Sequence, residues 1–152
     1  MRWTKTFLVA GIMAVTSVAN AADVAPGDVV FEDGMVSVSL SGVAGNAETG
    51  AKTLANRKLG NCLACHVVDA MSNQPFHGNV GPELNGVADR WSEQELRAIV
   101  ADAKLVFGEQ TVMPGFYSLN VGVDVRKDLV GKTLLSAQDV EDVVAYLITL
   151  RE

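Results

Sequence analysis

The feature that most constrains this chain is the run Cys62-Leu63-Ala64-Cys65-His66, which contains both cysteines and one of the two histidines of the sequence. Two cysteines this close together cannot build the disulfide framework that replaces a core in small exported domains. The pattern C-x-x-C-H is typical of covalent haem attachment, in which both thiols add to the porphyrin vinyl groups and the adjacent imidazole binds the iron. The run therefore predicts one haem c, attached to Cys62 and Cys65 and ligated by His66.

Two other uses of a paired-cysteine motif fit the sequence less well. A thioredoxin-like redox pair follows a strand within a βαβ unit, whereas here a helical pattern precedes the motif and a histidine follows it. A structural zinc site needs two further Cys or His ligands, and outside the motif the chain has only His77. With two imidazoles in all, a catalytic triad is improbable as well.

The first 21 residues have the composition of a secretory signal peptide. Arg2 and Lys5 precede an apolar run over residues 7–18, and Ala19-Asn20-Ala21 has the small-x-small form that signal peptidase cleaves. The apolar run is shorter than the roughly 20 residues that a transmembrane helix needs. We therefore expect cleavage after Ala21, a periplasmic location, and no membrane span in the mature chain.

The mature chain, residues 22–152, is acidic, with ten Lys and Arg against 18 Asp and Glu. This balance argues against nucleic acid or an anionic membrane as the main partner. Lys52, Arg57 and Lys58 nevertheless cluster just before the haem motif. They form either a docking patch near the porphyrin edge or simply the solvated face of a helix.

The chain after the signal divides into an extension over residues 22–46 and a helical domain over residues 47–152. Within the extension, Val36-Ser37-Val38-Ser39-Leu40 alternates as a β-strand does. One short strand cannot stand alone, so it either pairs within this chain or lies on something else. The extension is thus either a loosely packed leader or a docking arm for a partner.

Three helices are predicted in the domain. The first begins after the potential cap Asn46 and runs over residues 47–59 until Gly60 stops it. A capping box at residues 92–95 begins the second, which continues to about residue 105, and the third runs from Ser136 to the carboxyl end. The predicted fold class is all-α, with three or more helices around the haem and a long, organised loop over residues 106–135.

The sixth iron ligand must come from outside the motif, and the candidates are Met35, Met71, Met113 and His77. Met113 is favoured because Pro114 fixes the local turn and because the loop after the second helix can fold over the far haem face. A Met/His pair leaves no open site for small ligands, which suits electron transfer. His77 is the alternative ligand, although a loop histidine of this kind is more often solvated.

The run Gly81-Pro82-Glu83-Leu84-Asn85-Gly86 predicts a turn followed by an apolar anchor. The carbonyl of Pro82 could accept the Nδ1 hydrogen of His66 and so set the orientation and basicity of the ligand, as metal-bound histidines require. Leu84 would then pack on the porphyrin edge. We therefore place Pro82 and Leu84 in the haem environment.

Taken together, these motifs resemble class I cytochrome c over about residues 46–150. The resemblance rests on Gly50, the haem motif, Gly81-Pro82-x-Leu84-x-Gly86, Met113-Pro114 and Tyr146. It implies that the first and last helices cross at a contact between a glycine and an aromatic residue. Leu54 departs from the family pattern, which usually has an aromatic residue there.

Three longer runs, over residues 60–66, 111–117 and 127–140, resemble the SoxX family, the monohaem subunits of SoxAX complexes of bacterial sulfur oxidation. The resemblance implies His66 and Met113 as axial ligands and a larger, haem-bearing SoxA-like partner. It also implies that the complex acts as an L-cysteine S-thiosulfotransferase, joining thiosulfate to a cysteine of a sulfur-carrier protein, and that this subunit passes the electrons to a downstream cytochrome. No catalytic residue is expected in this chain, because the haem consumes both cysteines.

Two other functions stay open at this point. A free monohaem cytochrome could shuttle electrons between larger complexes without any permanent partner. A haem sensor or peroxidase would instead leave the sixth position vacant, which the presence of Met113 disfavours.

Overall fold

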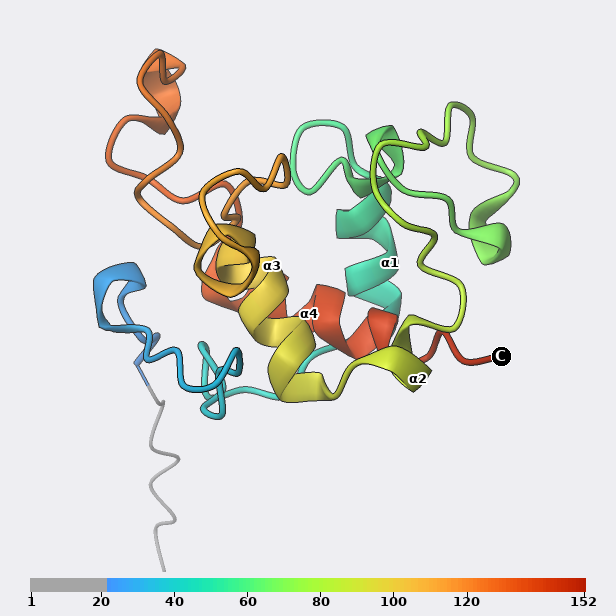
Figure 1. Cartoon of the computed structure of the whole chain (residues 1–152), viewed down its shortest axis with the longest axis horizontal. Helices are drawn as coiled ribbons and strands as arrows, with labels where there is room; N and C mark the ends of the chain where they lie inside the picture. Colours follow the sequence, from blue (N-terminus) through green and yellow to red (C-terminus); the bar gives the residue numbers. More distant parts are fainter. Residues whose placement is uncertain (1–21) are drawn as a thin grey trace, which may run out of the picture.

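The computed structural model describes residues 22–152, so the predicted signal peptide over residues 1–21 lies outside it. All regular structure in the described residues is helical, which confirms the all-α class. Figure 1 shows the α-helices, which are α1 (Ala47–Ala55), α2 (Val87–Arg90), α3 (Glu93–Phe107) and α4 (Ala137–Leu147). Short 3-10 turns are η1 (Pro26–Asp28), η2 (Cys62–Ala64), η3 (Asp69–Met71) and η4 (Lys127–Leu129). No helix among residues 22–152 is long and apolar enough to cross a membrane.

Local capping chemistry sets where the three main helices begin. The Asn46 side chain accepts a hydrogen bond from the Thr49 backbone N–H, as its position before α1 predicts. Ser92 with Glu95, and Ser136 with Asp139, form complete capping boxes at the starts of α3 and α4. Each box satisfies two backbone amides that the first turn of a helix leaves unpaired.

The first helix is shorter than predicted, ending at Ala55 rather than continuing to residue 59. The Asn56 side chain accepts a hydrogen bond from the Lys58 backbone N–H, and the Asn56 carbonyl accepts from Leu59 and Asn61. Such local bonds compete with helix propagation. Residues 56–61 therefore form turns that connect α1 to Cys62.

The core is built where α4 packs between α1 and α3 (Figure 1). Gly50 of α1 lies against the backbone of α4 at Asp142, with no space for a side chain between them. Leu54, one turn further along α1, is completely buried. The helix crossing that the family resemblance implies is thus present with leucine in place of the usual aromatic residue.

The extension over residues 22–46 contains no strand. The β-strand that the alternating residues 36–40 predict is therefore wrong. Val36 and Leu40 are buried because they pack into the core of the helical domain. The Val36 N–H bonds to the Gln94 carbonyl, and the Tyr117 hydroxyl donates to the Val24 carbonyl at 2.6 Å. The extension is therefore neither a loose leader nor a free arm, but part of the folded unit.

A buried ion pair anchors this extension to the helices. Arg97 of α3 and Glu141 of α4 lie 2.9 Å apart with almost no exposure of either side chain. Glu141 also accepts from the Leu40 N–H, and Arg97 donates to the Val36 carbonyl. Burial acts to lower the pKa of Arg97, but its bonds to Glu141 and to Glu93 outweigh burial and raise it.

Candidate haem site

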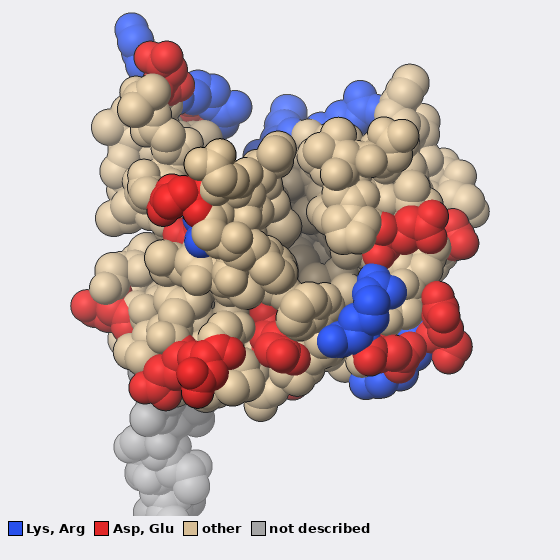
Figure 2. Space-filling view, in the orientation of Figure 1, with Lys and Arg blue, Asp and Glu red and all other residues tan. Residues whose placement is uncertain are grey.

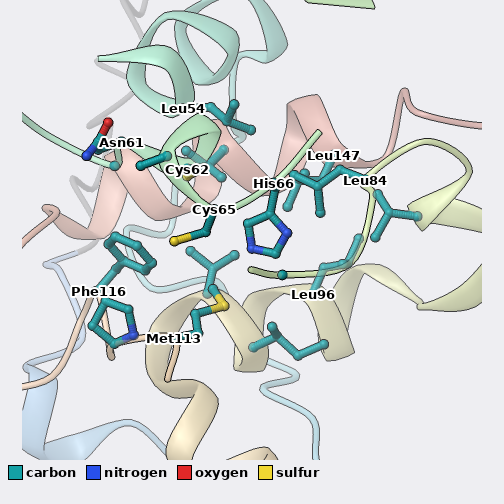
Figure 3. Close-up of a pocket in the computed structure, with 18 of the residues that line it drawn as sticks. Leu54, Asn61, Cys62, Cys65, His66, Leu84, Leu96, Met113, Phe116 and Leu147 are labelled. Atoms are coloured by element: carbon teal, nitrogen blue, oxygen red, sulfur yellow. The ribbon is translucent and has the colours of Figure 1, made fainter. Parts of the chain in front are cut away.

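A cavity of about 650 Å³ opens between α3, α4 and the loops that follow α1 and α3. This volume is typical of a site for a cofactor or a small molecule. Figure 3 shows the cavity with its labelled lining residues. The lining brings together all six residues predicted for the haem site, Cys62, Cys65, His66, Pro82, Leu84 and Met113. Most of the remaining wall is apolar, from Leu54, Leu96, Ile99, Val100, Phe116, Leu135, Val143 and Leu147.

The cysteine motif forms a single tight turn at the cavity wall. The Cys62 carbonyl accepts hydrogen bonds from the backbone N–H groups of Cys65 and His66, at 3.0 and 2.9 Å. Burial raises the pKa of the Cys62 thiol to about 12. A redox-active pair needs a thiolate near neutral pH, so this environment does not suit thioredoxin-like chemistry. Within the described residues, neither cysteine forms a disulfide.

The imidazole of His66 is fixed from two sides. Its Nδ1 lies 2.6 Å from the Pro82 carbonyl oxygen, as the sequence predicts for this proline. Because a carbonyl can only accept, Nδ1 carries the hydrogen and Nε2 keeps its lone pair for a metal. The ring also lies so close to Gly81 that any side chain there would collide with it.

A break in α3 shapes the loop that carries Met113. Asp102 has non-helical dihedral angles, φ −153° and ψ 94°, in the middle of the helix. The break leaves carbonyls of α3 unpaired, and two of them accept from the following loop: Val100 from the Phe116 N–H, and Ala101 from the Tyr117 N–H. The chain is thereby held against α3 three residues after Met113.

Lys104 holds the other end of the same loop. Its ammonium group donates to the Thr111 carbonyl at 2.6 Å and to the Glu109 carbonyl at 3.1 Å. Its own backbone N–H donates to the side chain of Asp102, which caps the second segment of the helix. Asp102 and Lys104 hold this loop through their hydrogen bonds, and sequence reasoning missed them because the helical pattern continues across them without a Gly or Pro.

Of the four candidate sixth ligands, Met113 alone is among the described residues that line the cavity. His77 instead accepts a hydrogen bond through Nδ1 from the Val68 N–H, and its buried Nε2 has no partner among the described residues. Met71 lies in the apolar core, and the backbone of Met35 pairs with Glu32. The geometry favours Met113 over His77 as the predicted ligand.

The residues present fit a covalent haem. The thiols of Cys62 and Cys65 lie at one wall, beside the imidazole of His66. The thioether of Met113 comes from the loop after α3 (Figure 3). The apolar walls suit a porphyrin, and they would keep water from the iron. The individual roles of these residues stay predictions.

The predicted basic cluster before the motif does not form one patch. Lys52 pairs with Glu48 at 2.7 Å on the exposed surface of α1. Arg57 lies over the ring of Phe76, 5.2 Å from its centroid, and also lines the cavity. Lys52 thus belongs to a solvated helix face, as one of the two interpretations expects, while Arg57 lies at the cavity.

The family model for Cytochrome c matches the chain over residues 47–151, which contain the whole cavity lining. The chain belongs to the cytochrome c family. This assignment, together with the C-x-x-C-H motif, confirms the expected haem c. It also confirms the predicted class I cytochrome c fold.

Two solved structures are similar to this cytochrome. One is the crystal structure of SoxXA from P. pantotrophus, with 43% sequence identity and a TM-score of 0.79, and the match covers 86% of this chain and 100% of that one. This match confirms the resemblance to SoxX. The other is ferric cytochrome c-550 from Paracoccus versutus, with 23% identity, a TM-score of 0.40, and coverage of 71% and 99%. No curated protein matches the chain.

Proposed function

We propose that this cytochrome is the SoxX subunit of a periplasmic SoxAX-type complex and transfers the electrons released when thiosulfate is joined to a carrier-protein cysteine. The observation that carries the proposal is the 43% identity to a SoxXA structure over the whole of the matched chain. The cavity supports it, since it combines the two thiols, His66 and Met113 in one apolar site. A larger SoxA-like subunit is the proposed permanent partner, and a downstream cytochrome is the proposed acceptor.

In this proposal Cys62 and Cys65 would hold the haem as thioethers, and His66 and Met113 would bind its iron. The haem, when bound, supplies reversible one-electron transfer. The Pro82 carbonyl holds the imidazole and increases its basicity through the 2.6 Å bond to Nδ1. A neutral Met ligand raises the reduction potential relative to a second histidine, which suits an acceptor of electrons.

The chain itself contributes no nucleophile to the sulfur chemistry, because both of its cysteines are used for attachment. Joining the sulfane sulfur of thiosulfate to a cysteine thiolate forms one S–S bond and releases two electrons. We place that bond-forming step on the partner subunit and the carrier protein. This cytochrome takes the two electrons one at a time and passes them on, so the thiosulfotransferase activity belongs to the complex.

Export follows from the predicted signal peptide, which we propose is cleaved after Ala21. Covalent haem is attached after export in bacteria, so the location and the motif agree with each other. The mature chain would then comprise the extension over residues 22–46 and the cytochrome domain over residues 47–152. Hydrogen bonds from Leu40 to Glu141 and from Arg97 to the Val36 carbonyl connect these two parts.

The test is to isolate the native protein from periplasm and to determine its size, together with the haem content of each chain. Co-elution with a second, larger haem-bearing chain in a one-to-one ratio is expected. Elution as a lone monohaem monomer at every salt concentration would contradict the complex and favour the free electron shuttle. Binding of carbon monoxide by the reduced wild type would instead favour a sensor or peroxidase with an open sixth position.

A further inference from the structure

Residues 119–133, called here the lobe, protrude from the helical domain. Figure 1 shows this segment in orange, standing away from α3 and α4. None of its residues is buried, and its only regular structure is η4. A segment without a core of its own gains little stability from apolar burial, so its apolar residues need another explanation.

The lobe exposes large apolar side chains. Val123 is 98% exposed, Val130 65% and Leu119 55%. A single exposed apolar side chain is ordinary, but three large ones in fifteen residues of a protruding segment indicate a surface that a partner covers. Two more exposed valines, Val80 and Val112, lie at the cavity itself.

Basic residues gather at the same edge of an otherwise acidic chain. Five of the ten Lys and Arg of the mature chain lie in the lobe and in the turns after α1, namely Arg57, Lys58, Arg126, Lys127 and Lys132. The same segments contain two of the 18 acidic residues, Asp124 and Asp128. Figure 2 shows the blue side chains on the tip of the lobe and along the adjoining upper edge, with red side chains concentrated lower on this face.

Two of the lobe's three cations form no salt bridge within the described residues and can face carboxylates of a partner. Arg126 is already engaged by Asp128, at 2.7 Å. Among the described residues, Lys127 and Lys132 make no salt bridge. A complementary surface would therefore carry carboxylates facing these two lysines, around an apolar patch that covers Val123 and Val130.

The lobe is joined directly to the haem site. Leu134 and Leu135, which follow it in the chain, line the cavity, and so does Phe116, shortly before it. The Leu135 N–H also bonds to the Phe116 carbonyl, which closes the base of the lobe. The base of the lobe thus adjoins the cavity wall, and a partner that covers the lobe down to its base lies beside the haem site.

We propose that the lobe is the surface through which this cytochrome binds its larger haem-bearing subunit. The complementary surface of that subunit would be acidic and apolar. The inference rests on the proposed function, because it names the surface used by the proposed partner. The exposed valines favour a permanent subunit over a diffusing acceptor, since stable interfaces bury apolar groups whereas transient redox encounters are small.

The test measures affinity between the haem-loaded chain and the SoxA subunit of the same organism, by calorimetry at low and at high salt. Lys127→Glu and Val123→Ser are the lobe variants. Their matched controls are Arg151→Glu, at the far end of the chain, and Val38→Ser, an exposed valine of the extension. Lys127, Val123 and Val38 are exposed, so spectra and unfolding midpoints should equal those of the wild type in these three variants. Arg151→Glu also breaks the exposed pair with Asp89, so its own unfolding midpoint is measured alongside its binding.

Each lobe variant is expected to weaken binding by about tenfold, with the Lys127→Glu effect shrinking at high salt, while both controls bind like the wild type. Lobe variants that bind as tightly as their controls would overturn the lobe proposal and leave the proposed function intact. A wild-type chain that does not bind SoxA at all would overturn both.

Discussion

Gly50 of α1 lies directly against the backbone carbonyl of Asp142 in α4, with no room for even a methyl group between the two helices. This contact lets α1 approach α4 closely enough to bury Leu54 completely. It also fixes the position of the turns that follow α1 and lead to Cys62. The helix crossing therefore determines where one wall of the haem cavity stands.

Replacement of Gly50 by alanine should destabilise the protein, although alanine normally stabilises the interior of a helix. The added methyl group must push α1 away from α4, at a cost of about 2–3 kcal/mol in the free energy of unfolding. Denaturant unfolding measures this loss. Gly27→Ala is the control, because an added Cβ meets nothing within 4 Å there, and it should be nearly neutral. Equal stability of the Gly50 variant and the control would contradict the close contact.

Replacement of Met113 by alanine should open the sixth coordination position. The reduced variant is then expected to bind carbon monoxide, and the ferric variant to lose the absorption band of a methionine-ligated haem. His77→Ala tests the alternative ligand and should leave both properties as in the wild type, because His77 does not line the cavity. If the His77 variant binds carbon monoxide and the Met113 variant does not, the assignment of the ligand is wrong.

Replacement of Lys104 by methionine should loosen the Met113 loop without changing the ligands. The variant loses the bonds from the ammonium group to the Thr111 and Glu109 carbonyls, which should cost about 1–3 kcal/mol of stability. We expect cyanide to displace Met113 from the ferric protein about tenfold faster than in the wild type. Lys52→Met, on the solvated face of α1, is the control. Identical cyanide rates in the two variants would show that Lys104 does not position the loop.

Replacement of Arg97 by methionine leaves Glu141 as an unpaired buried charge and should cost about 3–5 kcal/mol. The double variant Arg97→Met/Glu141→Leu removes both charges and should recover part of this loss. The double variant also removes the acceptor of the Leu40 N–H, so hydrogen exchange at this amide should accelerate there. Unchanged exchange at Leu40 would mean that the ion pair does not hold the extension.

Features encoded in adjacent residues could be predicted from the sequence. The capping box at Ser92, the helix start at Ser136 and the Asn46 cap each depend on residues no more than three apart. The haem motif and the bond from His66 to Pro82 follow from short motifs as well. These local signals were sufficient to predict the fold class. They also identified the site residues that the structure places in one cavity.

Features that depend on distant residues could not be predicted. Glu141 bonds to the amide of Leu40, 101 positions away, and to Arg97, 44 positions away. Tertiary contact of this kind replaced the strand that alternation predicts at residues 36–40. The break at Asp102 is stabilised by amides of Phe116 and Tyr117, beyond the reach of any helix pattern.

The central claim is that this chain accepts the electrons released when thiosulfate is oxidised. The most direct test follows the absorbance of its haem over time in the reconstituted complex, under anaerobic conditions. The oxidised complex is mixed with thiosulfate and the sulfur-carrier protein, and the reduced α-band of this chain is followed. Our account predicts reduction that requires the carrier cysteine and disappears when that cysteine is replaced by serine. A haem that stays oxidised with every component present, although a chemical reductant reduces it, would contradict the account.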